Sequence, residues 1–106
     1  MTEKIQVINP YTQKSIGDYT FLPESEALKA ISFLKKNRER MTSLRPYERS
    51  QILEKLSALI EANKEELAMM ITKEMGKTIR DSRAEISRCV STVKCASEEA
   101  RRINGE

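Results

Sequence analysis

Hydrophobic and polar positions follow two different periods along this chain. Between Lys4 and Ile8, and again between Ser15 and Phe21, β-branched or aromatic residues alternate with polar ones. A period of two predicts strands. Pro10 lies between the two stretches, and its fixed φ and its effect on the preceding residue favour a turn there. Residues 4–21 are therefore predicted to form a β-hairpin, which needs a surface to lie on because an isolated hairpin is barely stable in water.

Helical spacing replaces the alternation after Pro23 and continues to the end of the chain. A first helix is predicted over residues 25–40, with its apolar positions at Leu28, Ile31, Phe33 and Leu34. A second helix begins near Pro46, whose missing N–H is tolerated in a first turn. Its apolar stripe is predicted to bury one face while Glu54, Lys55 and Glu61 stay in solvent. The stripe consists of Ile52, Leu53, Leu56, Leu59 and Ile60.

Two further helices complete the predicted helical region, residues 25–104. Asn63, followed three residues later by Glu66, predicts a capping box at the start of the third helix, and Gly76 predicts its end. The fourth helix is predicted over residues 78–104. Its small and apolar residues recur every seven positions in two adjacent lines, which predicts close packing against a neighbouring helix. The lines are Ile79, Ile86, Val93 and Ala100, and Ser82, Cys89, Ala96 and Ile103.

Composition narrows the class of protein. The 106 residues are long enough for one domain, so residues 1–106 are predicted to be a single, mainly α unit with an aliphatic core, since the chain has no Trp and few other aromatic residues. The net charge of +3 comes from 19 basic and 16 acidic residues that are interspersed along the chain. This distribution indicates a solvated surface and argues against nucleic acid as a partner. No apolar run predicts a membrane span or a signal peptide, so we expect a cytoplasmic protein without a membrane partner.

Several kinds of chemistry are missing from the sequence. The chain contains no His, which excludes an imidazole base. None of its three glycines lies in a phosphate-binding loop between a strand and a helix, so no dinucleotide site is expected within the chain. The carboxylates Glu65, Glu66, Glu98 and Glu99 are interpreted as exposed helix-surface groups and not as catalytic ones.

The two cysteines are also interpreted without a catalytic role. Cys89 and Cys95 are six residues apart on one predicted helix, so they point in directions about 120° apart and do not pair with each other. Free thiols fit a reducing compartment. Cys89 belongs to the predicted seam and is expected to act as a small hydrophobic residue, whereas Cys95 is expected to be a surface thiol.

Four stretches, in this order, resemble the amino-terminal part of the aldehyde dehydrogenase superfamily. They are Ile8–Thr12, Leu44–Arg49, Lys64–Lys77, and Arg83–Ile86 with Ala96–Ala100. Their sequences most resemble the branches of the family that act on succinate semialdehyde, lactaldehyde and phosphorylated glyceraldehyde. The sequence departs from the family pattern at Gln13, where glycine is usual, and at Thr78, where proline is common.

The resemblance implies a parent oxidoreductase that converts an aldehyde to a carboxylate and passes hydride to NAD or NADP. In that family the nucleophilic cysteine, the glutamate base and the cofactor-binding loop come later in the chain, and no residue here matches them. The resemblance thus implies that this chain is an inactive amino-terminal fragment without catalytic or cofactor-binding residues. It would supply outer helices to an α/β Rossmann-like cofactor-binding domain, with the remainder of the dehydrogenase as its partner.

One site is carried over from the resemblance. Many family members hold a weak monovalent cation between main-chain carbonyls and a carboxylate, at positions that match Val7, Ile8 and Glu74 here. Hard cations favour such oxygen ligands. The alternative is that Glu74 is only a carboxylate at a helix end.

Two readings of the whole chain remain. If the chain is a dehydrogenase fragment, its helix faces lack their natural partner, and we expect the isolated chain to self-associate as an oligomer. The alternative is a free-standing helical interaction module that binds a protein through the seam of the fourth helix.

Overall fold

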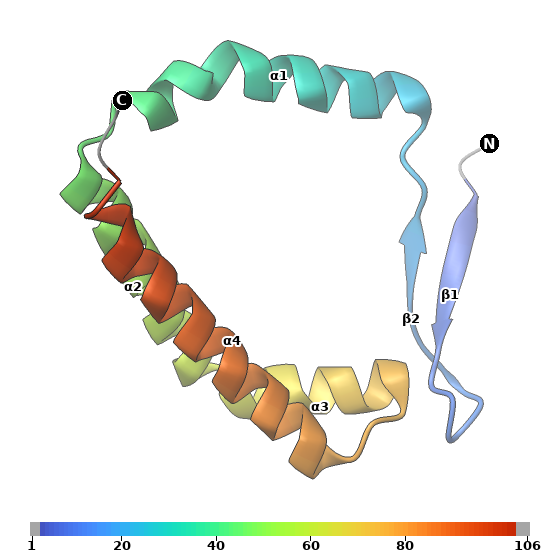
Figure 1. Ribbon diagram of the computed structural model, residues 1–106. Coiled ribbons are helices and arrows are strands. Elements are labelled where there is room, and N and C mark those ends of the chain that lie inside the picture. Colours follow the sequence, from blue (N-terminus) through green and yellow to red (C-terminus); the bar gives the residue numbers. More distant parts are fainter. Residues whose placement is uncertain (1–2, 104–106) are drawn as a thin grey trace. The chain divides into compact units, whose positions relative to one another are not determined.

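The computed structural model describes residues 3–103 of the chain. It contains a β-hairpin followed by four helices, in the order β1-β2-α1-α2-α3-α4 (Figure 1). The predicted class, mainly α with an amino-terminal hairpin, is confirmed. The chain divides into two compact units, Met1–Leu44 and Arg45–Glu106, and each is described by itself.

The hairpin consists of β1 (Lys4–Ile8) and β2 (Ser15–Thr20), which pair antiparallel. Val7 lies opposite Gly17, and the register shifts between Val7 and Ile8. The turn begins at Asn9, whose Oδ1 accepts hydrogen bonds from the amides of the second and third residues after it, at 2.9 and 3.1 Å. An Asn side chain that bonds to the following backbone in this way is a common turn device. The predicted hairpin is confirmed, one residue shorter in its second strand.

Helix α1 (Glu24–Thr42) completes the first unit. Pro23 precedes it in an extended conformation. Glu24 and Glu26 lie in its first turn, where negative charge interacts favourably with the helix dipole and stabilises the helix. None of the 19 residues of α1 is buried. The helix exists where the sequence predicted it, but its apolar residues remain in solvent.

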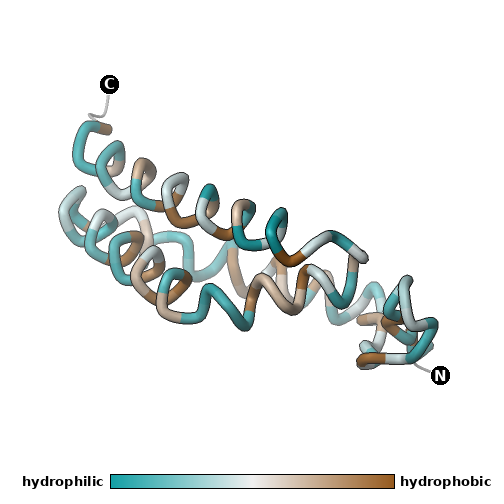
Figure 2. Tube along the Cα trace, turned by 90° about the horizontal axis from the view of Figure 1, so that it is seen from below, coloured by the Kyte–Doolittle hydropathy of each residue, from teal (hydrophilic) through white to brown (hydrophobic). Residues whose placement is uncertain are grey.

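The second unit is a three-helix arrangement of α2 (Pro46–Ala62), α3 (Lys64–Met75) and α4 (Ile79–Ala100). Helix α4 packs along α2 and also contacts α3. Hydrophobic residues are dispersed among hydrophilic ones along all of these helices (Figure 2). No helix within residues 3–103 has both the length and the apolar character needed to cross a membrane.

The ends of these helices agree only in part with the ends predicted from the sequence. Gly76 ends α3 in the left-handed conformation, with φ of 74°, as predicted. Thr78 caps α4, because its Oγ1 accepts a hydrogen bond from the amide of Asp81 at 3.2 Å. The capping box predicted at Asn63 is wrong: the Asn63 side chain instead donates from Nδ2 to the Leu59 carbonyl at 2.8 Å. The side chain is thus turned toward the preceding helix, and its Oδ1 accepts no hydrogen bond from the first turn of α3.

The buried centre of the second unit is small and rich in hydroxyl groups. Its buried apolar residues are Ala68, Ile86 and Ala100, and four serines are buried with them: Ser50, Ser57, Ser82 and Ser97. The apolar part of this centre is aliphatic, as expected, but the buried serines were not predicted. Small side chains let helix backbones approach closely, and the cost of burying their hydroxyls is offset only where these are hydrogen-bonded.

The predicted face of α2 is only partly correct. Leu53 and Ile60 are half-buried, but Ile52, Leu56 and Leu59 are exposed. The side that packs on α4 is centred on Ser50 and Ser57, seven residues apart. Bulky residues fill the other side of the helix. Glu54, Lys55 and Glu61 are exposed, as predicted.

The two predicted lines on α4 have different outcomes. The line Ile79, Ile86, Val93 and Ala100 is buried or half-buried and is confirmed. In the second line Ser82 is buried but Cys89 and Ala96 are exposed, so that line is wrong. A straight α-helix drifts about 20° per heptad. The positions of the first line stay within the surface of α4 that contacts α2 and α3, although they shift across it. The second line begins at the edge of this surface with Ser82, and its later positions turn toward solvent. Ser97 is buried in their place.

Candidate functional site

Serine hydroxyls and one arginine hold α2 against α4 near the carboxyl end of α4. Ser97 donates from Oγ to the Ser50 carbonyl at 2.9 Å, and the two Oγ atoms are 3.1 Å apart. Arg101 donates from Nε to the Ser50 Oγ at 2.9 Å. One carbonyl, two hydroxyls and one guanidinium are thus linked in a single hydrogen-bonded cluster between the two helices. These bonds are directional, so they fix the register of the two helices.

The same device recurs along α4. Ser57 donates to the Val90 carbonyl at 3.3 Å, and the hydroxyls of Thr72 and Ser82 are 2.9 Å apart. Among the described residues, no buried side-chain nitrogen or oxygen lacks a hydrogen-bond partner. These serines are thus engaged in packing, and their hydroxyls are not held ready as nucleophiles.

Two exposed ion pairs join the elements of the α3–α4 hairpin. Arg83 of α4 binds Glu65 of α3 through two nitrogens, with the Nη2–Oε2 distance at 2.8 Å. Lys77, in the connection, lies 2.7 Å from Glu85. The Arg83 hydrogen bond holds the pKa of the Glu65 carboxyl below its usual value, partly opposed by desolvation, and Glu65 raises the pKa of Arg83. The Lys77 hydrogen bond likewise lowers the pKa of Glu85.

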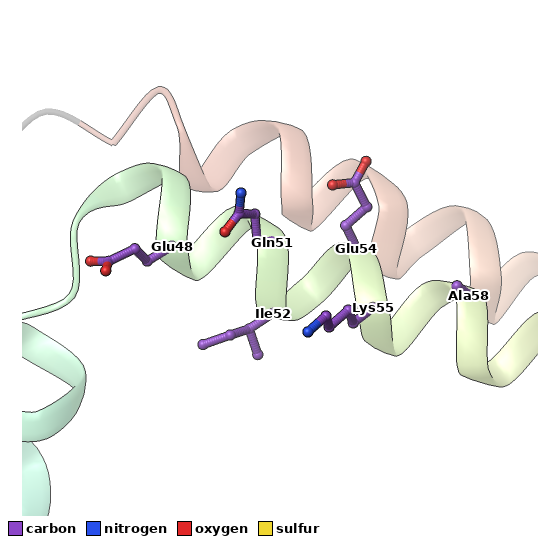
Figure 3. A pocket seen from close by; sticks show the side chains of 6 residues that line it. All are labelled: Glu48, Gln51, Ile52, Glu54, Lys55 and Ala58. Carbon is purple, nitrogen blue, oxygen red and sulfur yellow. The ribbon is translucent and has the colours of Figure 1, made fainter.

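A shallow groove runs along the surface of α2 (Figure 3). All of its lining residues come from this one helix. They are Glu48, Gln51, Ile52, Glu54, Lys55 and Ala58. The groove offers carboxylates, an amide and an ammonium around the exposed Ile52 but no hydroxyl or thiol nucleophile. Glu48 is already engaged, since its Oε2 accepts the backbone N–H of Arg45 at 2.7 Å.

The residues of the expected cation site fall in different units. Val7 and Ile8 end β1 in the first unit, and Glu74 is an exposed residue in the last turn of α3 in the second. Within residues 3–103 no three side chains of His, Cys, Asp or Glu cluster as metal ligands. Main-chain carbonyls are the expected ligands at two of the positions, so the site stays a prediction.

The thiols and the remaining carboxylates lie on exposed helix surfaces. Cys89 and Cys95 are both free and exposed, so the expectation of Cys89 as a packed hydrophobic residue is wrong and that of Cys95 as a surface thiol is confirmed. Glu66 and Glu98 are exposed as predicted.

The hydrogen-bonded cluster of Ser50, Ser97 and Arg101 was not predicted from the sequence. A signal was present, because Ser50 and Ser57 are spaced by seven residues, as are Ile86, Val93 and Ala100 on the helix that they meet. Ser82 was predicted among the packed small residues of the fourth helix, but no packing role was predicted for Ser50, Ser57 or Ser97. A stripe of small residues at helical spacing would have indicated the contact.

Comparison with known proteins gives this scaffold a family. The pattern of the aldehyde dehydrogenase family matches residues 1–106, the whole chain. The chain is 36% identical over 104 residues to the 3-sulfolactaldehyde dehydrogenase of Priestia aryabhattai, covering 98% of this chain and 21% of that protein. It is 35% identical over 102 residues to the lactaldehyde dehydrogenase of Methanococcus aeolicus, covering 96% of this chain and 22% of that protein.

The fold agrees with a solved member of the family. The glyceraldehyde-3-phosphate dehydrogenase GapN of Methanocaldococcus jannaschii, complexed with NADP, is 35% identical with a TM-score of 0.85. The match covers 88% of this chain and 20% of that one. The chain thus spans between a fifth and a quarter of the length of the relatives it matches. On the family pattern, the sequence identities and the fold together, the chain belongs to the aldehyde dehydrogenase family.

Proposed function

We propose that this chain is the amino-terminal scaffold of an NAD(P)-dependent enzyme that oxidises short aldehydes to carboxylates, and that the 106 residues have no dehydrogenase activity by themselves. The observation that carries the proposal is the match of the whole chain to about a fifth of each relative. The content of the chain supports the second part. It has no His, and its buried serines are engaged in helix packing. Covalent aldehyde oxidation needs an activated thiolate beside oxyanion donors and a nicotinamide.

The names of three of the relatives suggest a substrate class, whereas a fourth relative is named for sulfoacetaldehyde, a two-carbon aldehyde without a hydroxyl. Sulfolactaldehyde, lactaldehyde and glyceraldehyde 3-phosphate are three-carbon aldehydes with a hydroxyl on the second carbon. They differ only at the third carbon, which carries a sulfonate, a hydrogen or a phosphate. We infer that the complete enzyme oxidises a three-carbon 2-hydroxyaldehyde.

The proposed partner of the chain is the remainder of a dehydrogenase polypeptide. Helix α2 supports this, because it carries apolar residues on the side that does not face α4. Ile52, Leu56 and Leu59 are 49%, 43% and 62% exposed there, and they recur at helical spacing. Such a stripe is typical of a helix that packs against a second element. A cytoplasmic location fits the two free thiols. A cation held by Val7, Ile8 and Glu74 would require the hairpin and α3 to meet in the complete enzyme.

A chimera tests the proposal. The matching segment of the Priestia aryabhattai enzyme is replaced by this chain, and reduction of NAD and NADP is measured with sulfolactaldehyde, lactaldehyde and glyceraldehyde 3-phosphate. Propionaldehyde, which lacks the hydroxyl, is the comparison substrate. The chimera should be active and should keep the substrate preference of the Priestia aryabhattai enzyme, because this chain is proposed to supply the scaffold and no catalytic residue.

Two variants of the chimera test the scaffold role. Leu56→Lys should lower the yield of folded, active enzyme, because it places a charge on the side proposed to be covered. Glu61→Lys, an exposed change on the same helix, should leave the yield unchanged. A folded but inactive chimera, or turnover by the 106-residue chain alone, would contradict the proposal.

The alternative of an interaction module is not supported in the form in which the sequence suggested it. That hypothesis placed the partner on the seam of α4. In the structure Ser82, Ile86 and Ala100 of this seam are buried, and α4 packs there on α2 and α3. A second protein cannot occupy the same surface.

A further inference from the structure

We propose that, in the chain by itself, α1 pairs with α1 of a second copy in an antiparallel arrangement. The contact would be made by an apolar stripe of Leu28, Ile31 and Leu34, here called the α1 stripe. These side chains are 55%, 61% and 67% exposed, and no residue of α1 is buried. Spacings of three residues place them on one side of the helix. With 19 residues, α1 is about 28 Å long, enough for several turns of contact.

The charges of α1 are distributed unevenly along its length, and this is what selects the second copy. Glu24 and Glu26 lie in the first turn, where Glu26 pairs with Lys29 at 2.7 Å, whereas Lys35, Lys36, Arg38 and Arg40 lie in the second half, with Glu39 the only acid there. One end of the helix is thus acidic and the other mainly basic. A helix of this kind is complementary to itself when it is turned end over end.

The antiparallel direction follows from the residues beside the stripe. By helical geometry Glu24 and Arg38 lie on the same side as the α1 stripe, one near each end. When two copies pair with Ile31 opposite Ile31, Leu28 of each copy lies opposite Leu34 of the other, and Glu24 lies opposite Arg38. Two-fold symmetry makes this ion pair twice. A parallel pair would instead place Glu24 beside Glu24 and Arg38 beside Arg38, which repel each other.

The acidic end also argues against an anionic membrane as the occupant. Helices that bind such surfaces carry Lys and Arg along the whole polar face. Here the first turn carries two carboxylates, which an anionic surface would repel. The polarity of the charges therefore favours a partner helix with the opposite polarity, and a second copy supplies one.

Charge reversal with sedimentation equilibrium tests the pairing. The 106-residue chain is measured at low salt as wild type, Glu24→Arg, Arg38→Glu and the double variant. Each single reversal should weaken dimerisation about tenfold, because each repels twice across the two-fold axis, and the double variant should restore it. Lys36→Glu, a reversal that lies off the stripe, is the matched control and should change the dimerisation constant less than threefold. Far-UV circular dichroism checks that every variant keeps its helices.

The apolar part is tested separately. Ile31→Lys at the centre of the α1 stripe should give a monomer, whereas Phe33→Lys, an equally exposed change outside the stripe, should still dimerise. A monomeric wild type would overturn the proposal, as would single reversals without effect or a double variant that is not restored. An active chimera with a monomeric 106-residue chain would overturn this inference alone and leave the proposed function standing.

Discussion

Gln13 is the one non-glycine residue within residues 3–103 that has a positive φ, at 60°. Its side chain donates from Nε2 to the Pro10 carbonyl at 2.7 Å. This hydrogen bond stabilises the turn, whereas the positive φ of the same residue destabilises it. Left-handed backbone costs an L-residue roughly 1–2 kcal/mol, a cost that glycine avoids. Glycine is usual at this position in the family that the sequence resembles, and the observed φ gives the physical reason for it.

Replacing this residue should strengthen the hairpin. Gln13→Gly removes the backbone strain but also the side-chain bond to Pro10, so we expect a net gain of about 0.5–1 kcal/mol in hairpin stability. Amide hydrogen exchange at Val7 and Gly17, which lie opposite each other in the ladder, measures it. Gln13→Val, with a β-branched side chain at positive φ, should speed exchange at the same amides. Equal exchange in both variants would show that the φ of this residue does not limit the hairpin.

At Ser97 the cost of burying a hydroxyl is offset by the hydrogen bonds that this hydroxyl makes. Ser97→Ala removes a hydroxyl that bonds to the carbonyl of Ser50 and meets its Oγ, and we expect a loss of about 1–2 kcal/mol in the free energy of unfolding. Ser91→Ala is the matched control, because the Ser91 hydroxyl is exposed and bonds only to Ser87 of its own helix. That change should cost less than about 0.5 kcal/mol. Urea unfolding measures both, and equal losses would show that the buried contact has no special weight.

At the scale of elements, the α3–α4 hairpin depends on charge. The pKa of Glu65 and that of Glu85 are both lowered by their basic partners, so each carboxylate favours the folded state. The folded pKa lies below the unfolded one, and the resulting stability is present above the ordinary glutamate pKa of about 4.3 and is lost as the pH falls through the lowered value. Both pairs are exposed, and salt should weaken them.

This gives a prediction for pH. The urea midpoint of the chain should fall between pH 6 and pH 3, roughly the range in which these carboxylates become protonated. Glu65→Gln should show a smaller fall, because it has lost one of the two carboxylates whose pKa is lowered by a basic partner. Glu66→Gln, at the adjacent exposed position, should retain the wild-type fall. If the Glu65→Gln and wild-type curves stayed parallel down to pH 3, the Arg83 pair would not contribute.

The elements were predictable where a single residue decides the backbone. Pro10, Pro46 and Gly76 act through their own φ or a missing N–H, and the turn, the start of α2 and the end of α3 lie where these residues place them. Packing was predicted less well. Which side of α2 is covered depends on its neighbour, and close approach to α4 favours Ser50 and Ser57 over the larger Leu56 and Leu59. Hydrophobic periodicity alone does not contain that information.

The candidate site was predicted in its parts and not in its arrangement. The sequence indicated that no imidazole and no phosphate loop would be found, and this follows from composition alone. Whether Val7, Ile8 and Glu74 share a cation depends on contacts between segments far apart in the chain. The hydroxyl contact of Ser50 and Ser97 joins residues 47 positions apart, and only the folded structure shows that they meet.

At the scale of the whole molecule, the second unit has its own buried centre. Ala68, Ile86 and Ala100 all belong to Arg45–Glu106, whereas α1 in the first unit has no buried residue. We therefore expect residues 45–106 to stay helical when residues 1–44 are removed. Circular dichroism and urea unfolding of the shortened chain check this, and its midpoint should lie close to that of the full chain. Complete loss of the helical signal would show that the second unit depends on the first.

The small, hydroxyl-lined contact between α2 and α4 has a consequence for the response to temperature. Unfolding raises the heat capacity when apolar surface becomes hydrated and lowers it when polar surface does. A contact built from Ser50, Ser57, Ser97 and Ala100 exposes much polar and little apolar surface as the helices separate. The heat-capacity change of this unit should therefore be small for its length. Its stability would vary gently between cold and warm conditions, with a flat maximum and a broad thermal transition.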